Sequence, residues 1–226
     1  MTQTHTHAAY EGELQQLRDH VTRMGEQVRS MLSQSLSALT RGDRRLAHAT
    51  IALDHTVNRL EVESDDMCMK ILARRQPVAS DLRFVATAHK LVTDLERIGD
   101  LCVNICERAI ELEDPADAEI GARLEEMGTR VSAMIDNALT AFLGVDVAKA
   151  ERVLEDDGPV DQAYVEIFEE LLERMRRTEA DLHDATRLQS VAKHLERIGD
   201  HATNVAEMVI FMVDARDVRH PGRLAS

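Results

Sequence analysis

The hexapeptide LERIGD occurs twice in this chain, and each copy pairs two carboxylates. In both copies a glutamate stands four residues before an aspartate: Glu96 and Asp100, then Glu196 and Asp200. On an α-helix, residues four apart lie one turn apart on the same face. Like charges in that arrangement destabilise a bare helix by a few tenths of a kcal/mol. Such a cost at two matching places indicates a compensating cation or a basic partner.

Polar residues in the preceding segments extend these faces. Before the first hexapeptide they recur at three- and four-residue steps: Asp54, Asn58, Glu61 and Asp65. The matching positions of the second half begin with two more acids and continue with aromatic residues: Asp157, Asp161, Tyr164 and Phe168. Hard cations, and iron or manganese, accept oxygen-rich sites of this kind.

An interpretation without any binding function also remains open for these stripes. A carboxylate stripe opposite an apolar stripe is usually a solvated helix face. Arg97 and Arg197, inside the two hexapeptides, could also satisfy the acids by bridging within or between helices. The face of each hexapeptide continues into an asparagine and a glutamate, Asn104 and Glu107 in the first copy and Asn204 and Glu207 in the second. Because both stripes match and both contain asparagine, the sequence supports a solvated face and a cation site about equally.

Cysteine and histidine offer weaker candidates. Cys102 and Cys106 have helical spacing, but both fall on the apolar side and are expected to pack in the core. His201 follows Asp200 and is the best candidate for an additional metal ligand, whereas His194 is expected to face solvent.

Enzymatic chemistry finds no support in the motifs. The chain lacks G-x-x-x-x-G-K-[ST], G-x-S-x-G and H-E-x-x-H. Di-iron carboxylate bundles use Glu-x-x-His, but the residues three beyond Glu96 and Glu196 are Gly99 and Gly199. We therefore expect a protein that is not an enzyme.

Composition limits the class of protein. The 226 residues include only 4 Pro and 10 Gly, and aromatic residues make up 3%, which is typical of a helical protein. The formal net charge of −14 without a basic cluster argues against nucleic acid as a partner. Three cysteines, no apolar run of membrane-spanning length and no signal-like beginning indicate a cytoplasmic protein.

The hexapeptide belongs to a longer repeat. In the first part of the chain the offset is 103, as between Met24-Gly25 and Met127-Gly128, and near residue 75 it falls to 100. The three missing residues correspond to the turn at 75–77, which can change length without rotating side chains off a helix face. The chain therefore contains two copies of one structural unit.

Each copy divides into three helices. Apolar positions at three- and four-residue steps, with breaks at glycine and proline, predict helices at 9–40, 44–74, 80–112, 118–143, 147–178 and 180–214. Gly158-Pro159 falls inside the fifth helix, where we expect a kink or an interrupted turn. The predicted fold is all-α, with two pseudo-symmetric three-helix bundles of six long helices at 9–114 and 117–215.

Several of these stretches resemble one known family. The repeated LERIGD, RQPVASDLRFV at 75–85 and NVAE at 204–207 are similar to the PhoU family of bacterial phosphate-signalling regulators, over about residues 10–214. The resemblance implies a PhoU-like fold, no enzymatic activity and negative regulation of the phosphate-starvation response. It implies two partners, a sensor histidine kinase and the ATPase subunit of the phosphate ABC transporter, and a homodimer is expected.

The resemblance also implies surface metal clusters of iron or zinc on E/DxxxD motifs. Carried over by position, the candidate metal ligands are Asp54, Asn58, Glu96, Asp100, Asp157, Asp161, Glu196 and Asp200. Asn58 stands where the repeat has Asp161, so the first site is expected to be poorer by one charge and the second to bind metal more firmly. Asp81 and Arg83 match the family's DLR stretch, and Asp81 can also favour a helix start.

Other functions remain open on sequence grounds. A metal-storage or redox carboxylate protein would also use paired acids, and a purely structural bundle could carry them only for solubility. Phosphate itself is not expected to bind directly to an acidic surface unless a metal bridges it.

Overall fold

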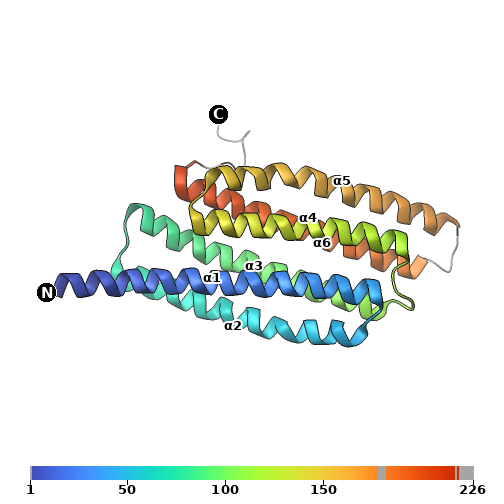
Figure 1. Ribbon diagram of the computed structural model, residues 1–226, viewed down its shortest axis with the longest axis horizontal. Helices are drawn as coiled ribbons and strands as arrows, with labels where there is room; N and C mark the ends of the chain where they lie inside the picture. The colour runs from blue at the N-terminus through green and yellow to red at the C-terminus, as the bar shows by residue number, and fades with distance from the viewer. Residues whose placement is uncertain (1, 178–181, 217, 219–226) are drawn as a thin grey trace.

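The computed structural model describes residues 2–177, 182–216 and 218, and these residues form six long helices (Figure 1). In chain order they are α1 (Thr2–Arg41), α2 (Arg44–Arg75), α3 (Ala79–Glu111), α4 (Ala118–Gly144), α5 (Val147–Arg177) and α6 (Leu182–Asp214). The all-α prediction is confirmed, although α1 begins before the predicted residue 9. The predicted start of the last helix at residue 180 lies outside the described residues. None of the six helices holds a stretch apolar enough to cross a membrane.

Short polar side chains set several helix ends. The Asp43 carboxylate accepts a hydrogen bond from the Leu46 amide at 2.9 Å and caps α2, after Gly42 has turned the chain with a φ of 63°. Asp117 caps α4 in the same way, accepting from the amides of Glu119 and Ile120. These caps satisfy amides that the first helical turn leaves unpaired, so each helix begins at a defined residue.

Of the kink or interrupted turn predicted at Pro159, the interruption is absent, because α5 runs from Val147 to Arg177 without a break. Pro159 has no amide proton to donate toward the Glu155 carbonyl. Glu155, Gly158 and Pro159 are all exposed, so that carbonyl can tilt outward and bind water. Exposure therefore lets this helix continue past its proline.

The helices form two layers that run along the long axis of the molecule, with α1–α3 in one and α4–α6 in the other (Figure 1). Within each layer every helix contacts the other two, and the layers meet through α1 against α4 and α3 against α6. Helices α2 and α5 therefore lie at the outer edges. One continuous apolar core, with side chains from all six helices, joins the two bundles.

The contact between α1 and α4 repeats itself about a pseudo-twofold axis. A Cβ atom added to Gly25 would lie 2.3 Å from Leu139 Cδ1, and one added to Gly128 would lie 2.1 Å from Leu36 Cδ1. The two glycines correspond in the repeat, and so do the two leucines. Each bundle thus inserts a leucine into a notch that the other bundle leaves open.

The contact between α3 and α6 brings the two hexapeptides together. The helices are antiparallel, since Asp94 meets His201 and the Arg83 guanidinium donates to the Met212 carbonyl. Asp94 directly precedes the first hexapeptide and His201 directly follows the second, so the two hexapeptides lie opposite each other. Their apolar members are buried at this crossing: Leu95, Ile98, Leu195 and Ile198.

The glycine notch gives a direct test of the interface between the bundles. We expect the free energy of unfolding of Gly128→Ala to be about 1–2 kcal/mol lower than that of Gly12→Ala, because the methyl group added at residue 128 overlaps the Leu36 side chain. Thermal unfolding followed by circular dichroism measures the change. Gly12→Ala is the matched control, since a Cβ atom at this α1 position meets nothing within 4 Å and raises helix propensity. If both variants were equally stable, the notch would not be a close contact.

Candidate functional site

The glycine of each hexapeptide lets an outer helix come close to it. A Cβ atom added to Gly99 would lie 3.3 Å from Val57 Cγ1 and 3.5 Å from Asp54 Oδ1, both on α2. One added to Gly199 would lie 3.4 Å from Val160 Cγ1 on α5. The small residue therefore seats α2 and α5 against the hexapeptides, and their acids join the acids of α3 and α6.

The first acidic cluster lies along the contact between α2 and α3 and consists of Asp54, Glu61, Glu96 and Asp100, with Asn58 beside them. The Asn58 amide donates to Asp54 Oδ2 at 2.8 Å. Two further oxygens in the cluster, Asp54 Oδ1 and Asn58 Oδ1, are buried without a hydrogen-bond partner. A buried oxygen that lacks a donor costs free energy, so this cluster favours the approach of a positive charge.

Burial and mutual repulsion both raise the pKa values of these acids. Burial raises the pKa of Asp54 above its ordinary value, and Asp100 raises it further. The pKa of Glu96 is raised first by burial and then by the charges of Asp100 and Glu61. The Glu96 side chain is only 19% exposed, so it is not the freely solvated group that a simple outward face would present.

Arginine bridging offsets only part of the repulsion among the acids of the first cluster. Arg97 approaches Glu96 at 3.6 Å and Asp100 at 3.9 Å, but its side chain is 60% exposed. Both separations are longer than a charge-assisted hydrogen bond. A solvated pair of this kind contributes at most about 1 kcal/mol, so Arg97 leaves most of the repulsion in place.

The second acidic cluster lies between α5 and α6 and consists of Asp157, Asp161, Glu196 and Asp200. Burial and the charge of Asp161 raise the pKa of Asp157, while the Thr203 hydroxyl donates to its Oδ1 at 3.2 Å. Burial, then Glu196 and Asp157, raise the pKa of Asp200. Glu196 Oε2 is buried without a partner, as two oxygens are in the first cluster.

Lys193 is a member of the second cluster that sequence reasoning missed. Its Nζ donates to Glu196 Oε1 at 2.6 Å and lies 5.2 Å from the centre of the Tyr164 ring. The hydrogen bond to Glu196 raises the pKa of the lysine, so it stays charged. Its position three residues before Glu196 on one helix face is a signal that the sequence did contain.

The two clusters carry equal numbers of carboxylates once Glu61 is counted, although the predicted ligand set of the first holds one acid fewer than that of the second. Asn58 does replace the acid found at Asp161. However, Glu61 lies close enough to Glu96 to raise its pKa, and the repeat has Tyr164 at the corresponding place. The difference between the sites is therefore the cation, with exposed Arg97 at the first and tightly bound Lys193 at the second.

The donor set fits a hard cation in its chemistry. All eight predicted ligands belong to one cluster or the other, they offer oxygen atoms, and three of those oxygens have no donor. Within the described residues, however, no three Asp, Glu, His or Cys side chains already surround one point. Binding a metal would therefore require the more exposed carboxylates, such as Asp100, to rotate toward the buried oxygens.

Both predicted histidine placements need correction. The Nδ1 atom of His201 lies 2.8 Å from Asp94 Oδ1 on α3, so this ring bridges the two bundles rather than joining Asp200. His194 is partly buried and not solvent-facing. Burial, and then the charges of Arg197 and Arg108, lower its pKa to about 4. These rings turn inward because α3 covers this face of α6.

The ends of the polar stripes leave the acidic clusters. Asn104, Asn204 and Glu207 line two pockets where α3 meets α6. Glu111 forms an ion pair with Arg108 at 2.7 Å. The polar stripe of α3 therefore contacts α2 at the first acidic cluster and α6 further along. The stripe of α6 likewise contacts α5 at the second cluster and α3 further along.

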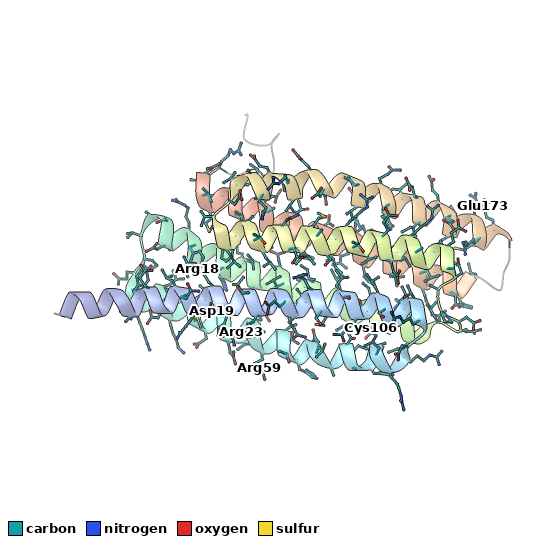
Figure 2. The ribbon with its side chains drawn as sticks, viewed as in Figure 1. Arg18, Asp19, Arg23, Arg59, Cys106 and Glu173 are labelled. Carbon is teal, nitrogen blue, oxygen red and sulfur yellow. The ribbon has the colours of Figure 1, made fainter. Side chains whose placement is uncertain are left out.

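The cysteines pack in the core, as predicted. Cys102 and Cys106 are fully buried, and Cys106 contacts Ala38 and Ala47 close to the turn between α1 and α2 (Figure 2). Burial raises the pKa of Cys106 to about 12 and that of Cys102 further still. Both are therefore protonated thiols at neutral pH and poor metal ligands.

The DLR stretch anchors the turn before α3. The Tyr10 hydroxyl donates to Asp81 Oδ2 at 2.9 Å, and Arg83 reaches the Met212 carbonyl at 2.7 Å. Asp81 also lies in the first turn of α3, where a negative charge is favourable. These residues tie α1, α3 and α6 together and do not join either acidic cluster.

Comparison with known proteins identifies relatives over nearly the whole chain. The PhoU domain model matches residues 21–109 and 124–209. A curated Pseudomonas aeruginosa protein, the phosphate-specific transport system accessory protein PhoU homolog, is 36% identical over 96% of this chain and 90% of its own length. The crystal structure of PhoU from P. aeruginosa superposes with a TM-score of 0.88 at 36% identity, covering 92% of this chain and all of that one. That of the phosphate transport system regulatory protein PhoU from Streptococcus pneumoniae gives 0.86 at 29% identity, covering 92% and 99%.

Repulsion inside the clusters predicts a stability gain when a charge is removed. An acid with a raised pKa in the folded state is destabilising once pH exceeds that pKa, so metal-free Asp157→Asn should melt about 1–3 °C higher at pH 7. The gain should vanish at pH 3, where Asp157 is largely protonated. The Thr203 hydroxyl can still donate to the amide oxygen.

Asp156→Asn is the matched control, because Asp156 is the preceding residue on α5 and is exposed. Scanning calorimetry of both variants at the two pH values makes the comparison. A lower melting temperature for Asp157→Asn at pH 7 would mean that this carboxylate stabilises the fold.

Proposed function

The chain belongs to the PhoU family, and from that premise we propose that it is an accessory and regulatory protein of a bacterial phosphate-transport system. The observation that carries the proposal is the extent of the match. Both repeats fit the family model, and relatives named as phosphate-transport accessory or regulatory proteins align over more than nine-tenths of this chain. The likeness therefore covers both bundles and is not limited to one of them.

The regulator we propose acts by binding rather than by catalysis. It works in the cytoplasm and represses the phosphate-starvation response when phosphate is plentiful. Its partners are the ATPase subunit of the phosphate transporter and a sensor histidine kinase. Two acidic clusters at matching places on the outer helices could each meet a basic surface, which is why we assign them to docking.

Metal binding is the second element of the proposal. We assign iron or zinc, in clusters of several ions, to the eight predicted ligands of the two acidic clusters. The support is chemical, because buried oxygens without donors and carboxylates with raised pKa values are both stabilised by a cation. Bound metal would supply positive charge there, and the chain's own residues would hold it and present it to a partner.

A reporter of the phosphate-starvation response tests the docking role in cells. In a strain that lacks the native gene, the quadruple variant Glu96→Gln, Asp100→Asn, Glu196→Gln, Asp200→Asn should fail to repress the reporter at high phosphate. We expect reporter output close to that of the empty strain, because the clusters lose four charges. The wild-type chain should restore repression.

A second quadruple variant removes the same charge elsewhere. Its four exposed acids lie outside both clusters: Glu113→Gln, Asp114→Asn, Glu155→Gln and Asp156→Asn. This control should repress like the wild type, with equal protein levels verified by immunoblot. Full repression by the cluster variant would contradict the docking role.

Metal content is tested separately on purified protein without an affinity tag. Elemental analysis should find iron or zinc in the wild type, and chelation should lower its melting temperature by several degrees, because a ligand that binds only the folded state stabilises it. The cluster variant should contain less than a tenth of that metal. A metal-free wild type whose melting temperature does not respond to added iron or zinc would overturn this part. Iron-dependent peroxide turnover would instead favour a redox carboxylate protein.

A further inference from the structure

Two pockets of about 300 Å³ flank the crossing of the hexapeptides, where α3 meets α6. The first seam pocket has Lys90, Thr93 and Asp94 from α3 and Met208 from α6 in its wall. The second seam pocket is lined by Asn104, Arg108, Gln189, Ser190, Lys193 and His194. A shift of 100 residues carries one set onto the other, so the pockets are copies made by the repeat.

The copies have diverged in charge. Where the first seam pocket has Thr93 and Met208, the second has Lys193 and Arg108. Where the first has Asp94, the second has His194. Ser190 in turn stands where the first pocket has its one cation, Lys90, and no acid of the second lining matches Glu207 of the first. The second lining thus holds two cations and no acid, against one lysine and two acids in the first.

The second seam pocket therefore has no acidic residue in its wall, in a chain whose formal net charge is −14. Every side chain that lines it can donate a hydrogen bond. Two of the six are permanent cations. A lining with two cations and no acid is unusual in a chain in which Asp and Glu outnumber Lys and Arg by 41 to 27.

The surrounding contacts hold the cations in place without filling the pocket. Arg108 pairs with Glu111 at 2.7 Å and approaches Glu107 at 3.8 Å, and Lys193 pairs with Glu196 at 2.6 Å. These acids lie outside the lining and restrict the two long side chains to one region. The Nδ1 atom of His194 is buried without a hydrogen-bond partner, so the wall also contains an unsatisfied polar atom.

We propose that the second seam pocket binds a small oxyanion of the phosphate class, either inorganic phosphate or the phosphate group of a compact ester. Arg108 and Lys193 supply charge, and Asn104, Gln189 and Ser190 supply hydrogen bonds. The expectation from the sequence was that phosphate does not bind directly to an acidic surface without a metal, whereas the lining of this pocket holds two cations and no acid.

The pocket lies between the two bundles, so a ligand bound in it contacts both of them. Asn104 and Arg108 belong to the first bundle, and the other four lining residues belong to the second. A bound anion therefore bridges the bundles beside the crossing of the hexapeptides. This inference goes beyond the regulatory role and does not depend on it.

Isothermal titration of the purified full chain at low salt tests the site, with inorganic phosphate and a nucleoside monophosphate as separate probes. We expect one saturable site per chain for at least one probe, and the tighter probe identifies the source of the phosphate group. The double variant Arg108→Gln, Lys193→Gln should bind at least 10-fold more weakly. Lys90→Gln, which removes the cation of the first seam pocket, should change affinity less than twofold.

A second variant keeps the test decisive if the double variant misfolds. Ser190→Asp places an acid in the wall at a partly exposed position and should abolish binding while the circular dichroism spectrum stays unchanged. Absence of saturable binding for both probes would overturn the proposal. So would an equal loss of affinity in Lys90→Gln, since that would indicate a diffuse electrostatic effect.

Discussion

The antiparallel crossing of α3 and α6 is the contact on which the rest of the structure depends. Its centre is made by the two copies of one hexapeptide, whose leucines and isoleucines are buried there. Burying each such side chain contributes about 1.5–3 kcal/mol. Because the same six residues also carry the glutamate and the aspartate, fixing the buried face fixes the direction of the carboxylates. The crossing therefore directs one acidic cluster toward α2 and the other toward α5.

The acids of these clusters lower the stability of the fold in the absence of a cation. The apolar core of two joined bundles is large enough to hold several carboxylates at raised pKa, each at a cost of a few tenths to about 1 kcal/mol. An outer helix with glutamine or alanine at these positions would fold at least as well. We interpret the retained repulsion as the energetic signature of a surface that acts by meeting positive charge, whether from a metal or from a partner. In the second cluster, Lys193 already neutralises part of the negative charge through its hydrogen bond to Glu196.

The sequence predicted the fold well because helical spacing and the repeat both report on burial. The repeat located two matching units and the turns between helices, and the apolar positions of α3 were found buried as expected, Cys102 and Cys106 among them. Helical arithmetic identifies a face but not the helix that will cover it. For that reason His194 and His201 were misplaced, and Asn104 and Asn204 were grouped with the acids although they line the seam pockets. At Pro159, where a kink or an interrupted turn was expected, the helix is not interrupted, because the exposure of one carbonyl depends on tertiary structure.

The central claim is that the two acidic clusters are the docking surface of a regulator. Its most direct test is the affinity of the purified chain for the transporter ATPase subunit and for the kinase domain, measured across a range of salt concentrations. Charge-driven docking predicts an affinity that falls steeply as salt rises, with a clearly smaller slope once the four hexapeptide acids are neutralised. An affinity that is independent of salt and unchanged by neutralising those acids would contradict the claim.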